Sequence, residues 1–524
     1  MSPSYLSPGV YVEEVDKGTK PIEAVGTAVA AFIGYTEKAT DVKDGNTVSL
    51  LGKPTLCTNW SQYVAKFGGF VAGAYLPDSV YGYFANGGGN CYIVSIKTLG
   101  VSDDPTLSTA AKAVLPSGDA KPTNLLEISA KSGGPTGNNI SVNVKPGEAK
   151  DGKPATDFTL VVNVNGAPAE TFEGVTLARG ENNVETVVKT KSKLIDVKVV
   201  GKSELAPPAG SFELSGGELK TKAVTLKDYQ GDSAARLGMA GLEPLDDVTM
   251  VIVPDLMTSY EAGEIDAKGV QAVQQAVIDY CEGVRYCFAI LDCPPNLMPQ
   301  EMKAWRYQVN YDSTRAAMYY PWIEIADMTG NAGRTRMVPP SGHVAGVYAR
   351  TDATRGVHKA PANEVVRGTI GLGVNVTKGE HDLLNPIGVN VIRSFPGRGI
   401  RVWGARTLSS DPSWKYINVR RLFNMVEESI ERGTQWVVFE PNDMNLWARV
   451  RRDISAFLTL VWRTGALFGE TPDRAFYVKC DAETNPPEVR DVGQLIVEIG
   501  LCPTKPAEFV IFRVSQWAGP DAQG

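Results

Sequence analysis

The stretch from Asn385 to Gly469 decides how this chain is interpreted, and it begins NPIGVNVIRSFPGRGIRVWGARTL. Val389 to Arg393 is a short apolar strand, Pro396 to Gly399 is rich in turn residues, and Ile400 to Trp403 can return as a second strand. The sequence therefore predicts a β-hairpin at the start of this stretch.

Two amphipathic helices are predicted after the hairpin. Asp411 is a candidate N-cap of the first helix, and Gly433 can end it. The second helix follows a predicted strand at Trp436 to Phe439 and can be capped by Asn442 or Asp443. Apolar residues recur at three- and four-residue spacing in both: Val419, Leu422, Phe423, Val426 and Ile430, then Leu446, Val450, Ile454, Phe457, Leu458 and Val461.

The same two helices carry the one local concentration of basic residues. These are Arg420 and Arg421 in the first helix and Arg449, Arg451 and Arg452 in the second. One interpretation is a solvated helix face, because several glutamates are close in sequence. The other is that some of these arginines face an acidic partner and set its orientation. Both interpretations remain open at this level.

Size and charge limit the possible functions. The chain has 524 residues, 43% hydrophobic and 21% charged, with a net charge of −7. This length predicts roughly three to four domains, and the charge does not favour nucleic acid or an anionic membrane as the main partner. There is no uninterrupted apolar run typical of a signal peptide or a membrane span, so we expect synthesis in the cytosol and no direct membrane insertion. The seven scattered cysteines favour reduced thiols.

The N-terminal segment, MSPSYLSPGVYVEEV, alternates in a way that suits a strand. Val10 and Val12 fall on one side and Tyr11 on the other, whereas Pro3 and Pro8 hinder pairing within a sheet of the same chain. We interpret it as an arm that adds to the sheet of another subunit. A frayed terminus is the alternative.

The middle of the chain predicts an α/β layer that is interrupted once. Thr27 to Tyr35 and Asn90 to Ile96 are buried strands before the interruption, and Val248 to Val253 and Tyr286 to Asp292 follow it. Residues from Gly100 to about Leu226 form short alternating strands with turns between them, which predicts an inserted β-rich domain. The two halves are expected to share one sheet.

Few residues offer catalytic or ligand-binding chemistry. Asp255 and Asp292 follow apolar strands, where α/β enzymes place their sites, but strand-end carboxylates also cap loops. The segment Gly368 to Gly373 (GTIGLG) matches no complete dinucleotide or phosphate motif. The remaining candidates fit no metal or hydrolase pattern: Cys281, Cys287, Cys293, His343, His358 and His381. We therefore predict no metal and no cofactor.

Taken with YLSPGVYVEEV at the start and PAEFVIFRVSQW at the end, the series from Asn385 to Gly469 resembles the contractile tail sheath proteins of phages and of phage-tail-like injection particles. The resemblance covers both ends strongly and the middle moderately. It implies a multidomain fold with α/β and α+β parts and exchanged terminal strands. The implied domains are an N-terminal linking arm (1–22), an α/β core (23–100 plus 227–384), an inserted β-sandwich-like outer domain (101–226), a C-terminal α+β domain facing an inner tube (385–505) and a C-terminal linking arm (506–524).

The function that this resemblance implies is mechanical. Hexameric rings of the chain would stack as a helical sheath around an inner tube protein, with baseplate and tail-terminator or cap proteins as further partners, and would contract to drive the tube through a target envelope. Assembly would take place in the bacterial cytoplasm. The implied strand-exchange residues are Val10, Tyr11, Val12, Phe509, Val510, Ile511 and Phe512, and the candidate inner-tube contacts are the five arginines above. An α/β enzyme with a site at Asp255 and Asp292 and a static shell protein are the alternatives.

Overall fold

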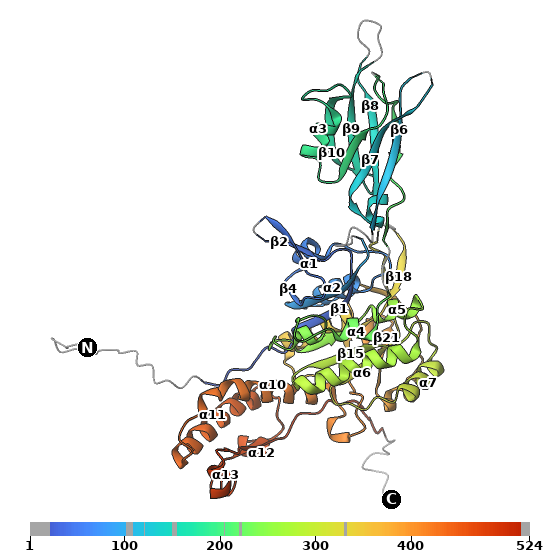
Figure 1. The fold of residues 1–524 in the computed structure, drawn as a ribbon. Coiled ribbons are helices and arrows are strands. Elements are labelled where there is room, and N and C mark those ends of the chain that lie inside the picture. The colour runs from blue at the N-terminus through green and yellow to red at the C-terminus, as the bar shows by residue number, and fades with distance from the viewer. Residues whose placement is uncertain are drawn as a thin grey trace, which may run out of the picture. The chain divides into compact units, whose positions relative to one another are not determined.

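The computed structural model describes residues 21–43, 45–100, 108–119, 121–148, 155–203, 205–219, 223–329 and 333–514. They divide into two compact units, whose elements are labelled in Figure 1. The α/β unit contains residues 26–421 and 505–514 of this set, and the C-terminal unit contains residues 21–25 and 422–504. Each unit is described by itself below.

A nine-stranded sheet forms the centre of the α/β unit, in the order β19-β22-β21-β16-β15-β14-β1-β5-β4. The strands from β21 to β5 in that order are parallel, and the edge strands are antiparallel. Because β1 pairs with β5 before the insertion and with β14 after it, the prediction that both halves share one sheet is confirmed. The strands are β1 (Ala30–Thr36), β4 (Thr55–Cys57), β5 (Cys91–Thr98), β14 (Met250–Ile252), β15 (Phe288–Asp292), β16 (Ala316–Tyr320), β19 (Glu364–Val365), β21 (Val389–Phe395) and β22 (Gly399–Val402).

Helices cover both faces of this sheet. All seven residues of β1 are buried, and they alternate between two apolar clusters: Ala31 and Ile33 face one cluster, and Ala30 and Phe32 face the other. Parallel strands buried on both faces need such double covering. The first face packs against α5 (Leu256–Glu261), α6 (Ala267–Val284) and α7 (Pro299–Val309), and Figure 1 shows α6 alongside β15. The second packs against α1 (Trp60–Phe67), α2 (Leu76–Ala85) and α8 (Ser341–Arg355).

The inserted segment has a core of its own. Two four-stranded sheets, β10-β9-β8-β12 and β11-β7-β6-β13, contribute to a third apolar cluster that includes Leu126, Val142 and Leu160. The elements are β6 (Ser108–Pro116), β7 (Asn124–Gly133), β8 (Ile140–Pro146), β9 (Asp157–Val164), β10 (Ala167–Thr176), α3 (Val184–Lys191), β11 (Ile195–Val199), β12 (Gly210–Glu213) and β13 (Glu218–Leu219).

Smaller elements complete the α/β unit. They are the hairpin of β2 (Thr40–Lys43) and β3 (Asn46–Ser49), the three-stranded sheet of β17 (Ile323–Ala326), β18 (Thr335–Val338) and β20 (Thr369–Leu372), and the helices α4 (Leu226–Gln230) and α9 (Lys378–Leu384).

The predicted hairpin exists as β21 and β22, but it does not open the C-terminal unit. Val389 of β21 pairs with Met318 of β16, so the hairpin extends the nine-stranded sheet. The compact C-terminal unit begins at Leu422 instead of the expected Asn385. Local turn residues identified the hairpin correctly. They could not reveal that β21 pairs with β16, because that strand lies about 70 residues earlier in the chain.

Two helices dominate the C-terminal unit. The unit boundary falls within α10 (Ile417–Gly433), which is followed by α11 (Met444–Arg463). Asp443 caps α11 by accepting a hydrogen bond from the Leu446 N–H, and the predicted apolar stripe of α11 is buried. The remaining elements are α12 (Pro472–Ala475), β23 (Phe476–Lys479), α13 (Pro487–Asp491) and β24 (Glu498–Leu501), with β23 and β24 paired antiparallel.

Several predicted boundaries are wrong. The strand expected at Trp436 to Phe439 is a 3-10 turn over Gln435–Val437, because Phe439 has a φ of 68° and is fully exposed. Asp411 caps a separate 3-10 turn, so α10 starts later, at Ile417. Phe509 to Val514 is not part of any sheet among the described residues.

The separate core of the inserted segment leads to a testable prediction. Replacing residues 101–222 with a short Gly/Ser linker should leave the nine-stranded sheet folded, because the third cluster shares no residue with the two clusters on the sheet. Cooperative thermal unfolding, followed by circular dichroism, measures this. A shortened chain that no longer folds would show that the insertion is integral to the α/β unit.

Candidate functional site: ion pairs at the chain crossings and an apolar groove

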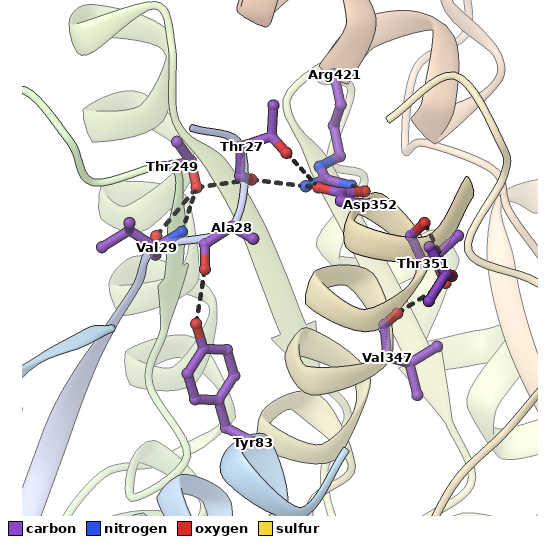
Figure 2. Close-up of polar contacts among 10 residues, drawn as sticks. Thr27, Ala28, Val29, Tyr83, Thr249, Val347, Thr351, Asp352 and Arg421 are labelled. Atoms are coloured by element: carbon purple, nitrogen blue, oxygen red, sulfur yellow. Dashed lines mark hydrogen bonds and ion pairs between the residues drawn. The ribbon is translucent and has the colours of Figure 1, made fainter. Parts of the chain in front are cut away.

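One buried ion pair lies beside two of the places where the chain passes between units. The chain crosses close to Thr27 and directly after Arg421. Arg421 donates from Nη1 to Asp352 Oδ1 at 3.0 Å and from Nη2 to Asp352 Oδ2 at 2.6 Å (Figure 2). Nη2 also donates to the Thr27 carbonyl at 2.8 Å, and the Thr27 hydroxyl donates to Asp352 Oδ2 at 2.6 Å. We call Thr27, Asp352 and Arg421 the clamp.

The two residues that follow Thr27 are also fixed by hydrogen bonds. The Tyr83 hydroxyl donates to the Ala28 carbonyl at 2.6 Å, and the Val29 N–H donates to the Thr249 hydroxyl at 3.0 Å (Figure 2). The Thr249 hydroxyl also lies 2.9 Å from the Thr27 carbonyl. The entry of the chain into β1 is therefore fixed by side chains from α2 and from the start of β14.

The two charged side chains of the clamp are almost completely buried. The side chains of Arg421 and Asp352 are 3% and 6% exposed, and the guanidinium lies 4.7 Å from the centre of the Tyr348 ring. Burial alone lowers the pKa of Arg421, but the charge of Asp352 and its hydrogen bonds raise it above the ordinary value. Removing one partner of such a pair leaves an uncompensated buried charge.

Replacing Asp352 with alanine should therefore lower the free energy of unfolding by about 3–5 kcal/mol, as measured by chemical denaturation. Arg474→Met is the matched control, because the Arg474–Glu470 pair lies on the surface, with 69% and 88% of the two side chains exposed. Its effect should stay within about 0.5 kcal/mol. Equal losses in both variants would show that the clamp contributes no more than a surface pair.

The C-terminal arm, Phe509 to Val514, is exposed. Glu508 is bound to Arg406 of the α/β unit, and five apolar residues follow it within the arm. Their exposed fractions are 71% for Phe509, 69% for Val510, 78% for Ile511, 85% for Phe512 and 94% for Val514. The N-terminal candidates Val10, Tyr11 and Val12 lie outside the described residues.

A groove of about 780 Å³ runs through the C-terminal unit. Ile430 of α10 and Leu446, Val450 and Ile454 of α11 form apolar walls, and the segment from residue 493 to 499 closes another side. Val438 and Phe439 at its margin are 66% and 103% exposed. The accessible apolar surface therefore lies at the margin of the groove, because Leu446, Val450 and Ile454 in its wall are at most 4% exposed.

The five candidate arginines do not form one surface. Arg420 is 5% exposed and stacks 4.2 Å from the Trp414 ring, and Arg421 belongs to the clamp. These two side chains are buried, so they do not present an exposed face for a partner. Arg449, Arg451 and Arg452 lie on α11, and the inner-tube contact stays a prediction for these three.

The three α11 arginines also have neighbours within their own unit. Arg449 lies 4.4 Å from the Trp436 ring and 3.8 Å from Glu440, with 41% of its side chain exposed. Arg451 donates to the Cys480 carbonyl at 2.7 Å. Arg452 pairs with Asp453 and is 64% exposed. Arg451 and Arg452 are exposed and Arg449 is half-buried, so all three can be reached from solvent.

Asp255 is an internal hydrogen-bond acceptor. It is fully buried and accepts hydrogen bonds from the backbone N–H groups of Tyr35 and Tyr75 and from the Thr258 hydroxyl. Burial raises its pKa to about 6, although these hydrogen bonds act in the opposite direction. The carboxylate therefore joins β1 to the start of α2 and has no exposed face for a substrate.

Asp292 has the same kind of role. Its Oδ1 accepts the Ser341 N–H at 3.0 Å at the start of α8, and its Oδ2 accepts the Ser341 hydroxyl. Burial raises the pKa of Asp292 to about 7. Because both carboxylates are buried and accept hydrogen bonds from protein groups, these contacts fit the interpretation of Asp255 and Asp292 as loop and helix caps.

The raised pKa of Asp292 predicts how stability changes with pH. An unfolded aspartate has a pKa of about 3.9, so between about pH 4 and 7 the folded state holds a proton that the unfolded state has lost. The free energy of unfolding should fall as pH rises through this window. Asp292→Asn should remove part of that slope in urea unfolding curves. An unchanged slope would mean that other groups are responsible.

The other chemical candidates are buried or dispersed. His343 is 3% exposed, and burial lowers its pKa to about 4. The GTIGLG segment forms β20 instead of a phosphate loop. All seven cysteines are free, and six of them are buried. Within the described ranges, no group of three His, Cys, Asp or Glu residues is placed to hold a metal ion, and no helix is long and apolar enough to cross a membrane.

Sequence reasoning missed Asp352, Arg406 and Glu508. Asp352 is 69 residues from Arg421, and Glu508 is 102 residues from Arg406. Helical spacing or a local motif cannot reveal pairs at such separations. The one available signal was a lone glutamate directly before the apolar run FVIF.

Two family models match the chain. The model of the phage tail sheath protein central domain matches residues 236–408, and the phage tail sheath C-terminal domain matches residues 409–516. Together they cover more than half of the chain.

Three curated relatives are tail sheath proteins by name. That of Vibrio phage KVP40 is 27% identical over 54% of this chain and 45% of its own length. A putative prophage major tail sheath protein of Pseudomonas aeruginosa UCBPP-PA14 is 30% identical over 47% of this chain and 63% of its own. The chain thus spans less than two thirds of these two relatives. The tail sheath protein of Burkholderia phage BcepMu is 23% identical over 98% of this chain and 97% of its own length.

Two solved structures share the mixed α/β multidomain fold. The PVC sheath complex of an extracellular contractile injection system, in its contracted state, is 25% identical, with a TM-score of 0.58 and 99% of both chains covered. The helical sheath of the anti-feeding prophage, also in its contracted state, is 24% identical, with a TM-score of 0.59. The match covers 97% of this chain and 99% of that one. With both family models and the named relatives in agreement, this chain belongs to the contractile tail sheath family.

Proposed function

We propose that this protein is a structural and mechanical subunit of a contractile tail sheath. Copies form hexameric rings that stack into a helical sheath around an inner tube, and contraction drives the tube through a target cell envelope. Similarity along nearly the whole chain to sheaths solved in the contracted state supports this role. In this role the chain catalyses no reaction and needs no cofactor.

The observation that carries the proposal is the exposed C-terminal arm. Five of its six residues are apolar and at least 69% exposed, and no described strand pairs with it. An extended apolar segment that its own subunit leaves unpaired is suited to β-strand addition. Arms exchanged in a direction that does not close into a ring produce an open helical assembly.

The receptor for the arm is the C-terminal unit of a second copy. The sheet of β23 and β24 has only two strands among the described residues, so its edges can accept another strand. Four to six added hydrogen bonds at roughly 0.5–1.5 kcal/mol each would give several kcal/mol per joint. The apolar groove can cover the arm's side chains. Val10, Tyr11 and Val12 supply the second exchanged strand.

The remaining parts take the roles that this assembly requires. Residues 1–22 and 506–524 are linking arms, 101–226 is an outer domain, and the C-terminal domain, whose compact part is residues 422–504, faces the inner tube. The exposed arginines of α11 are its candidate tube contacts. Baseplate and tail-terminator or cap proteins are further partners, and the particle, a phage tail or an injection system, assembles in the bacterial cytoplasm.

Changing Val510 and Phe512 together to proline tests this function. Proline removes ladder donors and the apolar side chains of the arm. Because both side chains are exposed, the circular dichroism spectrum and melting temperature of the variant should match those of the parent chain. Negative-stain images of the parent should show long striated tubes, and the variant should form monomers or isolated rings.

The substitution Val42→Ala is a control, since Val42 is an equally exposed apolar residue (69%) outside both the arm and the C-terminal unit. Normal tubes from the arm variant would contradict strand exchange by this segment. A parent chain that never forms tubes, even with an inner tube protein present, would contradict the sheath function. Tubes of a single length and diameter would favour a static shell.

A further inference from the structure

The last residue before the exposed arm is held by four side chains of the α/β unit. Arg406 donates from Nε to Glu508 Oε1 and from Nη2 to Oε2, both at 2.8 Å. Asn385 Nδ2 donates to Oε1 at 2.7 Å, and the Tyr416 hydroxyl donates to Oε2 at 3.1 Å. Lys415 Nζ lies 3.7 Å away. A two-point arginine–carboxylate contact of this kind fixes orientation as well as position.

Arg406 is also bonded to residues other than Glu508. Asn390 on β21 is fully buried, and its side chain accepts the Arg406 N–H at 2.7 Å and donates to the Arg406 carbonyl at 2.8 Å. The remaining guanidinium nitrogen, Nη1, donates to the Asn385 carbonyl at 3.0 Å. The backbone of Arg406 and one of its guanidinium nitrogens are therefore held by the α/β unit, which leaves Nε and Nη2 to bind Glu508.

The exposure of the chain to solvent increases abruptly after Glu508. The Glu508 side chain is 19% exposed, and hydrogen bonds from Arg406 and Asn385 outweigh burial and lower its pKa to about 2. The next residue, Phe509, is 71% exposed. Before Glu508 in the chain, Thr504 donates hydrogen bonds to the carbonyls of Ala466 and Gly465. Glu508 is thus the final fixed point of the described chain.

We propose that Glu508 is the positioning residue of the C-terminal arm: by closing onto Arg406 it sets the point at which the arm leaves the α/β unit, and hence which arm residues reach a second copy. This role rests on the proposed strand exchange. Without the contact, the arm would be free from Thr504 onward, which adds up to roughly 14 Å of reach at 3.3–3.6 Å per residue. A longer flexible segment before the arm lowers the effective concentration of the arm at its receptor. It also leaves undefined which arm residues pair with the receptor strand.

A glutamate-specific endopeptidase can test this contact on the unassembled full-length chain. The enzyme cleaves the Glu508–Phe509 bond only when the Glu508 side chain enters its specificity pocket, which cannot happen while Arg406 holds that side chain. Glu470, with 88% of its side chain exposed, serves as the internal reference site. The readout is release of the peptide from Phe509 to Gly524, measured by mass spectrometry.

Arg406→Met should raise cleavage at Glu508, relative to Glu470, at least tenfold, and Tyr416→Phe should raise it about two- to threefold, since one donor of several is lost. Lys479→Met is the matched control, because it removes the cation of the surface pair with Glu483 and should leave the ratio unchanged. If Arg406→Met fails to fold, Tyr416→Phe and Asn385→Ala carry the test. Rapid cleavage in the parent chain, or an unchanged ratio in these variants, would overturn the proposal.

Assembly supplies the second measurement. Glu508→Gln keeps the shape of the side chain but removes its charge, so the circular dichroism spectrum of the unassembled chain should match that of the parent chain. Its melting temperature should fall, because the mostly buried Arg406 loses its counter-charge, and the yield of regular tubes should fall several-fold. Tubes of normal yield and regularity from Glu508→Gln would contradict a positioning role. If the parent chain forms no tubes, the proposed function fails, whereas the cleavage ratios still decide whether Glu508 is held.

Discussion

The pairing of β1 with both β5 and β14 is the constraint on which the α/β unit depends. It joins two segments separated by the whole insertion into one sheet, and it requires parallel strands that are buried on both faces. Such strands leave no surface for water, so α5 to α7 must cover one face and α1, α2 and α8 the other. The insertion does not interrupt this sheet, because the two sheets of the insertion enclose a separate apolar core.

Two mostly buried ion pairs lie close to the points where the chain enters or leaves the α/β unit. The clamp of Thr27, Asp352 and Arg421 lies beside two crossings, and the contact of Glu508 with Arg406 lies at the third. Buried ion pairs contribute little net stability compared with apolar packing, but they demand a specific geometry. In the proposed sheath role, this geometry would fix the points at which the linking segments leave the unit.

The buried polar groups of the core are structural in the same sense. Asp255 and Asp292 follow strands, as catalytic aspartates of α/β enzymes do, yet each uses its oxygens to satisfy N–H groups at a helix start. Burial raises the pKa of both carboxyls, which shows that a shifted pKa at a strand end is not by itself a sign of catalysis. Accessibility separates the two cases, because no substrate can reach a fully enclosed carboxylate.

The sequence by itself determined the elements whose signals are local. Apolar periodicity identified α11, and turn residues identified the hairpin of β21 and β22. Even the sharing of one sheet by both halves followed from continuous apolar strands on either side of the insertion.

Only the tertiary structure decided which of these elements belong together. It moved the hairpin from the C-terminal unit to the nine-stranded sheet, buried Arg420 and Arg421, and brought Glu508 to Arg406 across 102 residues. The physical reason is that periodicity reports which face of an element is apolar, whereas the partner that covers this face, or neutralises a charge on it, is chosen by the fold as a whole.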